Sequence, residues 1–219
     1  MSTEPVHGMF DFCPSEETAP IWITNHLVTL FGEMPPPPKD GIVSLRLLKH
    51  ELFGTGGHPA SRIAIWRLLG VPNYDDPVPT PFIELGATTG LLALVAAISG
   101  TEQTYQGSNS VESAALAEDN GVLNGFEIRS EPLALSLDPD DRAEFYECVA
   151  TQVGGSTILR NFIPEIYASI KPGGYLLWAG HTASHHQGIK AQLEEFFKVE
   201  LVDDFMGWPA IVLRKAKTT

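Results

Sequence analysis

The feature that most constrains this sequence is a regular alternation of short strand-like segments with helix-like segments, joined by short turns. The segment Phe-Ile-Glu-Leu at 82–85, which is typical of a short buried strand, precedes an apolar helical segment that begins at residue 91, and the same order recurs along the chain. Such alternation is typical of a doubly wound, mostly parallel sheet with helices on both faces. We therefore predict an α/β fold whose ligands bind outside the carboxyl ends of the strands, where the strand order reverses.

The individual elements follow from apolar spacing and from turn residues. Strands are predicted at 42–48, 82–85, 104–107, 126–129, 145–153 and 175–179, with two more near 200–202 and 210–213. Helices are predicted around 63–69, from residue 91, at 111–123, at 158–170 and at 189–197. We expect the helix at 158–170 to end at the Lys-Pro-Gly-Gly turn of residues 171–174.

The first forty residues differ from the rest. Residues 1–14 are polar and interrupted by Pro and Gly, so we expect a loose arm. From residue 18, apolar side chains recur at three- and four-residue steps and predict an amphipathic helix, at Ile23, Leu27, Leu30, Phe31 and Met34. Four prolines at 35–38 then form an extended spacer. We therefore divide the chain into an arm and helix at 1–40 and a main domain at 41–219.

Composition excludes several classes of protein. Of 219 residues 43% are hydrophobic, which is enough for a core, and the net charge of −13 argues against a nucleic-acid clamp. The longest apolar run, 91–98, is far shorter than the roughly 20 residues of a membrane span. The first ten residues show no secretory signal. Cys13 and Cys148 form no metal-type cluster, so we expect free thiols and a cytoplasmic location.

Two glycine-bearing segments are candidates for binding a ligand. Residues 84–90 read Glu-Leu-Gly-Ala-Thr-Thr-Gly between a strand and a helix, where glycine allows a sharp turn close to a ligand. Residues 53–59 read Phe-Gly-Thr-Gly-Gly-His-Pro and also lead into a helix. Taken alone, each segment is equally well explained as a plain connection. Glu84 either orients this region towards a ligand or caps the turn that follows it.

The order of these motifs resembles that of the ribosomal-protein lysine methyltransferases of the PrmA type. Their Phe-Gly-Thr-Gly-x-His-Pro loop is similar to residues 53–59, and residues 84–90 occupy the place of their Asp-x-Gly-x-Gly-x-Gly turn. Residues 120–125 resemble their Asn-x-x-x-Asn-Gly helix end, and residues 149–151 stand where they have Val-Ala-Asn. Pro164 and the turn at 171–175 keep the spacing. The resemblance covers about residues 41–214 and implies a Rossmann-like, seven-stranded sheet that binds S-adenosylmethionine.

The resemblance also implies site residues. Phe53, Thr55 and Gly56 would cover the cofactor, Gly86 and Gly90 would shape the turn, Glu84 would orient it and Ser108 would contact the ribose. On the acceptor side the candidates are Thr151, Gln152 and His181. The sequence departs from the family at Thr88, where a glycine is usual, at Ser108, where an acid is usual, and at Thr151, where Asn is usual. Residues 1–40 do not resemble the family's N-terminal substrate module, which leaves its usual substrate open.

Three histidines follow the strand at 175–179, on the rim where ligands are expected. His181 is a candidate base or ligand because imidazole titrates near neutral pH. His58 would approach from the other loop. Because His185 and His186 are adjacent and do not easily face one ion, we predict no metal site. Neither a Gly-x-Ser-x-Gly elbow nor a phosphate loop occurs in the sequence.

Three functional hypotheses remain. The first is an S-adenosylmethionine-dependent methyltransferase acting on a nitrogen or oxygen nucleophile of a protein or a small molecule. The second, motivated by Thr88 and Ser108, is a methyltransferase-like binding or regulatory protein, with a homo-oligomer left open. The third is the same fold redirected to another ligand or reaction. The first requires the bends at 53–57 and 86–90 to meet in space.

Overall fold

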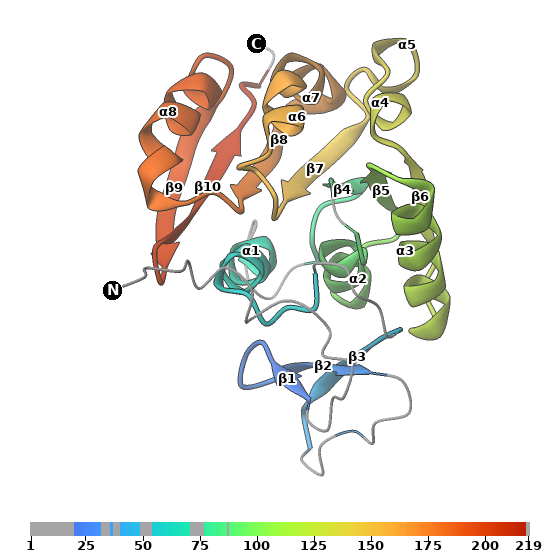
Figure 1. Ribbon diagram of the computed structural model, residues 1–219. Coiled ribbons are helices and arrows are strands. Elements are labelled where there is room, and N and C mark those ends of the chain that lie inside the picture. The colour runs from blue at the N-terminus through green and yellow to red at the C-terminus, as the bar shows by residue number, and fades with distance from the viewer. Residues whose placement is uncertain are drawn as a thin grey trace.

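A computed structural model of the chain describes residues 20–31, 36, 40–48, 54–70, 77–86 and 88–217 (Figure 1). The predictions made for the arm at 1–14, including Cys13, and for Met34 and Phe53 lie outside the described residues. No helix of the described part is long and apolar enough to cross a membrane.

The main domain is built on a seven-stranded sheet with the order β6-β5-β4-β7-β8-β10-β9. Its strands are β4 (Phe82–Leu85), β5 (Thr104–Ser108), β6 (Ile128–Pro132), β7 (Tyr146–Thr151), β8 (Ile170–Ala179), β9 (Lys198–Phe205) and β10 (Trp208–Arg214). The first five are parallel to one another, whereas β10 is antiparallel to both of its neighbours, β8 and β9. The predicted mostly parallel, Rossmann-like sheet is confirmed, and the strand order reverses between β4 and β7.

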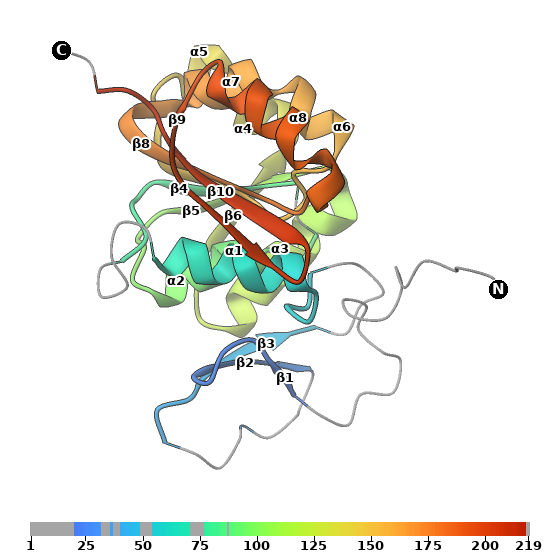
Figure 2. The same ribbon diagram turned by 90° about the vertical axis from the view of Figure 1, so that its left-hand side faces the viewer.

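Helices cover both faces of the sheet (Figure 2). One face carries α1 (Pro59–Leu69), α2 (Leu91–Ile98) and α3 (Val111–Leu123). The other carries α4 (Leu133–Ser136), α5 (Pro139–Arg142), α6 (Thr157–Asn161), α7 (Ile163–Ser169) and α8 (Ala183–Glu194). Strand side chains alternate between the two layers: Leu177 joins the core under α1 and α2, and Leu176 and Trp178 join the opposite core. The sheet is therefore buried on both faces.

The predicted N-terminal helix is wrong, because the described residues between 20 and 48 form a small three-stranded sheet. Its strands are β1 (Ile21–Trp22), β2 (Leu27–Phe31) and β3 (Val43–Leu47), with β2 antiparallel to β1 and parallel to β3. All five residues of β2 are buried, so no polar face reveals the strand period of two. The Thr24 hydroxyl accepts the N–H groups of His26 and Leu27 and turns the chain after β1. The division proposed at residue 40 falls inside this small sheet.

Two details of the main domain also differ from prediction. The helix α7 ends at Ser169, and residues 171–174 are an irregularity within β8 rather than a free turn. Gly173 has φ +82°, and the backbone of Gly173 and Gly174 is hydrogen-bonded to Lys215 beyond β10. The strand predicted at 126–129 lies at Ile128–Pro132, followed by the short unpredicted helix α4.

Candidate functional site

The predicted site residues that are described gather at the carboxyl ends of β4, β5, β7 and β8, around the reversal of strand order. Glu84 and Thr151 lie on neighbouring strands, because β4 pairs directly with β7. The bend at 54–57 comes from the chain between β3 and α1. Phe53 lies outside the described residues, so its predicted role stays a prediction.

Glu84 is fully buried and caps the helix α2 from the preceding strand. Its Oε2 accepts the N–H groups of Leu92 at 2.9 Å and Ala93 at 3.1 Å, and its Oε1 accepts from Gln152 Nε2 at 2.9 Å. Burial raises the pKa of Glu84 to about 7, against the lowering effect of the Ala93, Gln152 and Leu92 donors. Of the two roles left open by the sequence, the structure displays the cap.

The two glycine-bearing bends meet. Thr89 Oγ1 donates to the carbonyl oxygen of Gly54 at 2.7 Å, and Thr89 is fully buried. Gly54 has φ +116°, and a Cβ atom there would lie 2.5 Å from Thr89 Oγ1. The carbonyl oxygen of Thr55, also buried, accepts from Thr29 Oγ1 of β2 at 2.8 Å. The bend at 54–57 is therefore fixed on one side by the main domain and on the other by the small sheet.

The glycines of both bends allow close packing. A Cβ atom at Gly56, where φ is +90°, would lie 2.7 Å from Ile23 Cδ1. One at Gly90, where φ is +70°, would lie 2.9 Å from the Cβ atom of Ala117 on α3. Gly86, with φ +73°, leaves only 2.9 Å between such an atom and Val153 Cγ2. At the predicted residues Gly56, Gly86 and Gly90, the missing side chain therefore allows three other segments of the chain to pack closely against the two bends.

A hollow of about 290 Å³ opens beside the carboxyl ends of β5 and β6. It is lined by Ser108, Asn109, Ser110, Val111, Ala114 and Pro132. Ser108 Oγ donates to the carbonyl oxygen of Ser110 at 2.8 Å, and Ser110 Oγ accepts the N–H of Ser113 as the cap of α3. The Ser108 proton is therefore committed to the backbone, while its oxygen still has acceptor capacity.

On the other side of the reversal, Thr151 and Gln152 have different surroundings. Thr151 is buried, and its hydroxyl donates to the carbonyl oxygen of Leu85 and accepts the N–H of Val153. Gln152 is also buried, and while its Nε2 binds Glu84, its Oε1 has no hydrogen-bond partner among the described residues. A buried acceptor of this kind is costly unless something pairs with it.

His181 is the second buried group with an open atom. It is 1% exposed, and its Nε2 lies 3.1 Å from Nδ1 of the half-buried His186 in a parallel ring pair. Its Nδ1 has no partner among the described residues. Burial, and then the neighbouring His186 and His185, lower the pKa of His181 to about 4. In the described part of the chain, no three His, Cys, Asp or Glu side chains are grouped so as to hold a metal ion.

The loop after β7 and the end of β8 form a tight seam. Gly180 has φ +84°, and a Cβ atom on it would lie 1.8 Å from the carbonyl oxygen of Gln152. Gly154 N–H donates to Ala179 O, and Trp178 Nε1 donates to Gly154 O at 3.0 Å. The seam brings Gln152 and His181 to the same stretch of rim. The sequence reading missed Gly180, although a glycine directly after a buried strand was the available signal.

His58 has a structural role in addition to its place in the motif. Its Nδ1 accepts the N–H of Ala60 at 3.1 Å and caps α1, ahead of Pro59 in the first helical position. Its ring meets Trp208 edge to face, with centroids 4.4 Å apart. This contact joins the start of α1 to the β9–β10 hairpin.

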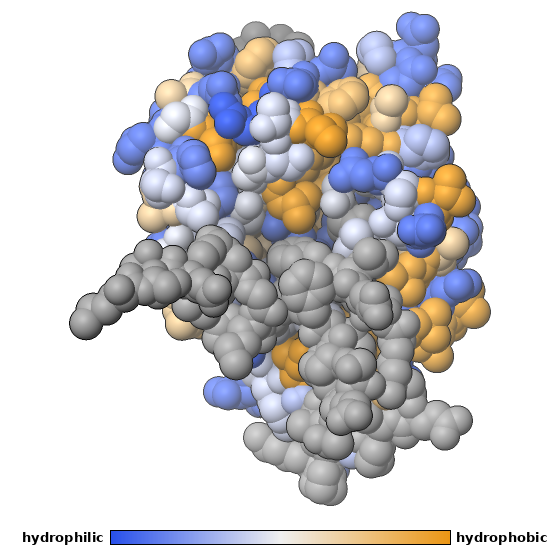
Figure 3. Space-filling view, viewed as in Figure 1, coloured by the Kyte–Doolittle hydropathy of each residue, from blue (hydrophilic) through white to orange (hydrophobic). Residues whose placement is uncertain are grey.

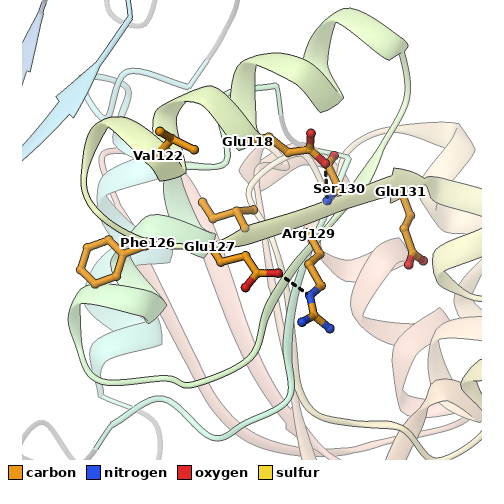
Figure 4. A pocket seen from close by; sticks show the side chains of 8 residues that line it. Glu118, Val122, Phe126, Glu127, Arg129, Ser130 and Glu131 are labelled. Carbon is orange, nitrogen blue, oxygen red and sulfur yellow. Dashed lines mark hydrogen bonds and ion pairs between the residues drawn. The ribbon is translucent and has the colours of Figure 1, made fainter.

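A second depression, of about 340 Å³, lies away from these residues, between α3 and the outer edge of β6 (Figure 4). Its polar groups bind one another: Glu127 pairs with Arg129 at 2.8 Å, and Glu118 accepts the N–H of Ser130. The exposed Val122 of α3 is among its lining residues, and Figure 3 shows apolar residues gathered along the right-hand side of the molecule. None of the predicted site residues lines this depression.

Comparison with known proteins supplies a family. The sequence profile of the family described as "Ribosomal protein L11 methyltransferase (PrmA)" matches residues 15–216. Proteins named ribosomal protein L11 methyltransferase are similar in Geobacter sp. strain M21, with 26% identity over 74% of this chain and 53% of that protein, and in Pseudomonas syringae pv. tomato, with 27% identity over 89% and 66%. This chain thus spans about half to two thirds of those relatives' length.

Solved structures share the fold. A ribosomal protein L11 methylase from Lactobacillus delbrueckii subsp. bulgaricus superposes with a TM-score of 0.73 at 20% identity, over 91% of this chain and 100% of that chain. The N-methyltransferase NodS from Bradyrhizobium japonicum WM9, in complex with S-adenosyl-L-homocysteine, gives a TM-score of 0.58 at 15% identity, over 72% and 88%. At these identities the likeness concerns the fold.

Proposed function

This chain belongs to the ribosomal protein L11 methyltransferase (PrmA) family, and on that premise we propose that it binds S-adenosylmethionine and transfers its methyl group to a nitrogen or oxygen nucleophile. The observation that carries the proposal is the contact between Thr89 and Gly54, which joins the family's two glycine bends at the reversal of strand order. A cytoplasmic location, expected from the cysteine content, belongs to the same proposal.

The cofactor would occupy the β4–β5 half of the rim. The residues present fit a nucleoside, because the Ser108 hollow approaches the range of about 300–1,000 Å³ usual for small-molecule sites. Ser108 Oγ would accept one ribose hydroxyl, since its own proton is committed to Ser110. Phe53, Thr55 and Gly56 would cover the cofactor from the other bend. Gly86 and Gly90 would set the shape of the turn, and Glu84 would hold that turn on α2.

The acceptor would occupy the β7–β8 half. Gln152 Oε1 and His181 Nδ1 are buried acceptor atoms without described partners, and a nucleophile bearing N–H or O–H would supply the missing donors. Thr151 would act only through the backbone, because its hydroxyl is already bound to Leu85 and Val153. When bound, the sulfonium supplies an electrophilic methyl group, which the nucleophile would attack in line with the departing thioether sulfur, so alignment by the chain is the main requirement.

His181 would take the proton that the nucleophile loses. With its own proton on Nε2, the ring donates to His186 Nδ1 and keeps a free lone pair on Nδ1. The lowered pKa keeps the ring neutral at pH 7, ready to accept a proton but unable to retain it. As Nδ1 gains the nucleophile's proton, Nε2 passes its own to His186, which is half-buried and reaches solvent.

The relatives named above are described as acting on ribosomal protein L11, and a protein nucleophile is accordingly the acceptor that we propose. The alternative is a chain that binds the cofactor without transferring methyl groups. The replacement of the family's acid by Ser108 favours that reading, since one hydroxyl cannot accept two ribose hydrogen bonds as a carboxylate does.

Calorimetric titration of the purified protein with S-adenosylmethionine and S-adenosylhomocysteine tests the first step. We expect micromolar dissociation constants, and absence of heat or thermal shift at millimolar ligand would overturn the proposal. Incubation of ribosomal protein L11 with radiolabelled S-adenosylmethionine tests the second step. Binding without label on L11, or on a protein extract freed of small molecules, would instead favour the non-methylating alternative.

A further inference from the structure

The Asn-x-x-x-Asn-Gly segment at 120–125 has a role that the site description does not use. Asn120 and Asn124 lie four residues apart at the end of α3, and their side chains bind the backbone at the end of β3 and just beyond it. Asn124 Oδ1 accepts the N–H of Arg46 at 2.7 Å, and its Nδ2 donates to Arg46 O at 2.7 Å. Asn120 Oδ1 accepts the N–H of Leu48 at 2.8 Å.

The match is geometric. Residues four apart on a helix are separated by about 6 Å along its axis, and residues two apart on a strand by about 6.6 Å. The N–H groups of Arg46 and Leu48 therefore face the same edge of β3 at the spacing of the two asparagines. The opposite edge of β3 pairs with β2. Two amide side chains thus replace a neighbouring strand, and they fix the register of β3 on the main domain.

Asn120 reaches a second partner. Its Nδ2 donates to the carbonyl oxygen of Thr89 at 3.0 Å, and the side chain is fully buried. Thr89 in turn donates from its hydroxyl to Gly54 O. One chain of hydrogen bonds therefore runs from Leu48 through Asn120 and Thr89 to Gly54, and so holds the backbone on both sides of residues 49–53.

We propose that Asn120 and Thr89 are positioning residues that hold the bend at 54–57 against the turn at 86–90, the arrangement on which cofactor binding depends. Gly54 O is the point of contact. Without the Thr89 hydroxyl this buried carbonyl oxygen would lose its donor. The two segments are closely packed at this point, since a Cβ atom on Gly54 would lie 2.5 Å from Thr89 Oγ1. The consequence for affinity rests on the proposed function, whereas the consequence for the bend does not.

The first test compares two similar substitutions. Thr89→Val removes the hydroxyl that binds Gly54 O but keeps the shape of the side chain. The matched control is Thr101→Val, because Thr101 Oγ1 donates to Val78 O at 2.7 Å in a buried position before β5, at the amino end of the sheet. Amide hydrogen exchange, followed by mass spectrometry, is measured on the peptide covering 54–57.

We expect at least tenfold faster exchange of that peptide in Thr89→Val and in Asn120→Ala, wild-type exchange in Thr101→Val, and restoration by Thr89→Ser. Asn124→Ala should have a smaller effect, because it removes the hydrogen bonds to the Arg46 backbone but leaves the link from Asn120 to Thr89 intact. Equal exchange in the two Thr→Val variants would overturn the proposal. If Asn120→Ala does not fold, the Thr89 comparison decides alone.

The second test measures the dissociation constant of S-adenosylhomocysteine well below the melting temperature. We expect Thr89→Val to weaken binding at least fivefold and Thr89→Ser to restore it, with no change in Thr101→Val. A purely structural role would lower the melting temperature of both Val variants and leave both dissociation constants unchanged. If the wild-type protein itself binds no S-adenosylhomocysteine, the proposed function fails, and the exchange comparison still decides the positioning role.

Discussion

The two halves of the rim treat their buried polar groups differently. In the β4–β5 half, Glu84, Thr89 and Ser108 each bind backbone groups, so their hydrogen-bonding capacity is largely used by the fold. In the β7–β8 half, Gln152 and His181 each retain one buried atom without a described partner. The difference teaches that one half is a preorganised frame and the other is incomplete by itself. A ligand bound to the incomplete half, as proposed above, would satisfy atoms that folding leaves open.

The largest expected effect breaks the seam between β7 and β8. Gly180→Ala would place a Cβ atom 1.8 Å from Gln152 O at a residue with φ +84°, and we expect a loss of about 3 kcal/mol or more in unfolding free energy. Urea denaturation measures it. The control is Gly188→Ala in α8, where nothing lies within 4 Å of the added atom and a gain of up to about 1 kcal/mol is expected. Equal unfolding free energies of the two variants would contradict the close packing of Gly180 against Gln152.

The next effect concerns Glu84 and pH. Because burial raises its pKa from 4.5 to about 7, the native state binds more protons than the unfolded state between these values. The unfolding free energy should therefore fall as pH rises through this window, by on the order of 3 kcal/mol, and stay level above it. The unfolding free energy of Glu84→Gln should lack this fall, so the difference between the variant and the wild type should shift in favour of the variant from pH 4.5 to pH 8. Parallel stability curves would show that the carboxyl does not titrate in this way.

His181 should give the opposite sign. Because its pKa is lowered from 6.5 to about 4, the unfolded state binds more protons between these values, and stability is lost as pH falls through them. We expect a loss of about 2 kcal/mol, less than for Glu84 because His186 links the ring to solvent. His181→Gln, which keeps a polar atom near Nε2, should remove it. The same substitution at the exposed His26 should not, and identical curves for both variants would contradict the prediction.

The smallest expected effect concerns ligand affinity at Ser108, in the β4–β5 half of the rim. Ser108→Asp restores the acid that the family carries at this position and should lower the dissociation constant of S-adenosylhomocysteine by about tenfold, or about 1.4 kcal/mol. Ser108→Asn, of similar size but uncharged, is the control in the same calorimetric titration. Unchanged or weaker binding by the Asp variant would count against placing the ribose at Ser108.

The fold was predictable because its main signals are local. Buried strands such as Phe82–Leu85 are short and mostly apolar, and the helix Val111–Leu123 was located to the residue. The small sheet was not predictable in the same way. The β2 strand is buried throughout, so its apolar spacing carries no period, and its partner β3 lies beyond four prolines.

The site was predictable only in part. The order of the motifs located the rim and the two bends. For Glu84 the sequence left two roles open, and the cap that the structure displays was one of them. What the sequence could not supply are contacts between distant segments, such as Asn120 with Leu48 and Thr89, or Gly180 with Gln152. These depend on which strands become neighbours. A pattern within one segment does not contain that information, and Asn120 carried a motif resemblance without a role.

The contacts at the outer edge of β6 have a consequence for association. The N–H of Ser130 already donates to Glu118 (Figure 4). Pro132, two residues further along the same strand, has no N–H to offer. An extended chain approaching this edge finds one donor occupied and the next one missing, so it gains little by aligning there. The side chains of Glu118 and Pro132 therefore disfavour the addition of a further strand at β6. This edge of the sheet is protected against aggregation without an extra helix or loop to cover it.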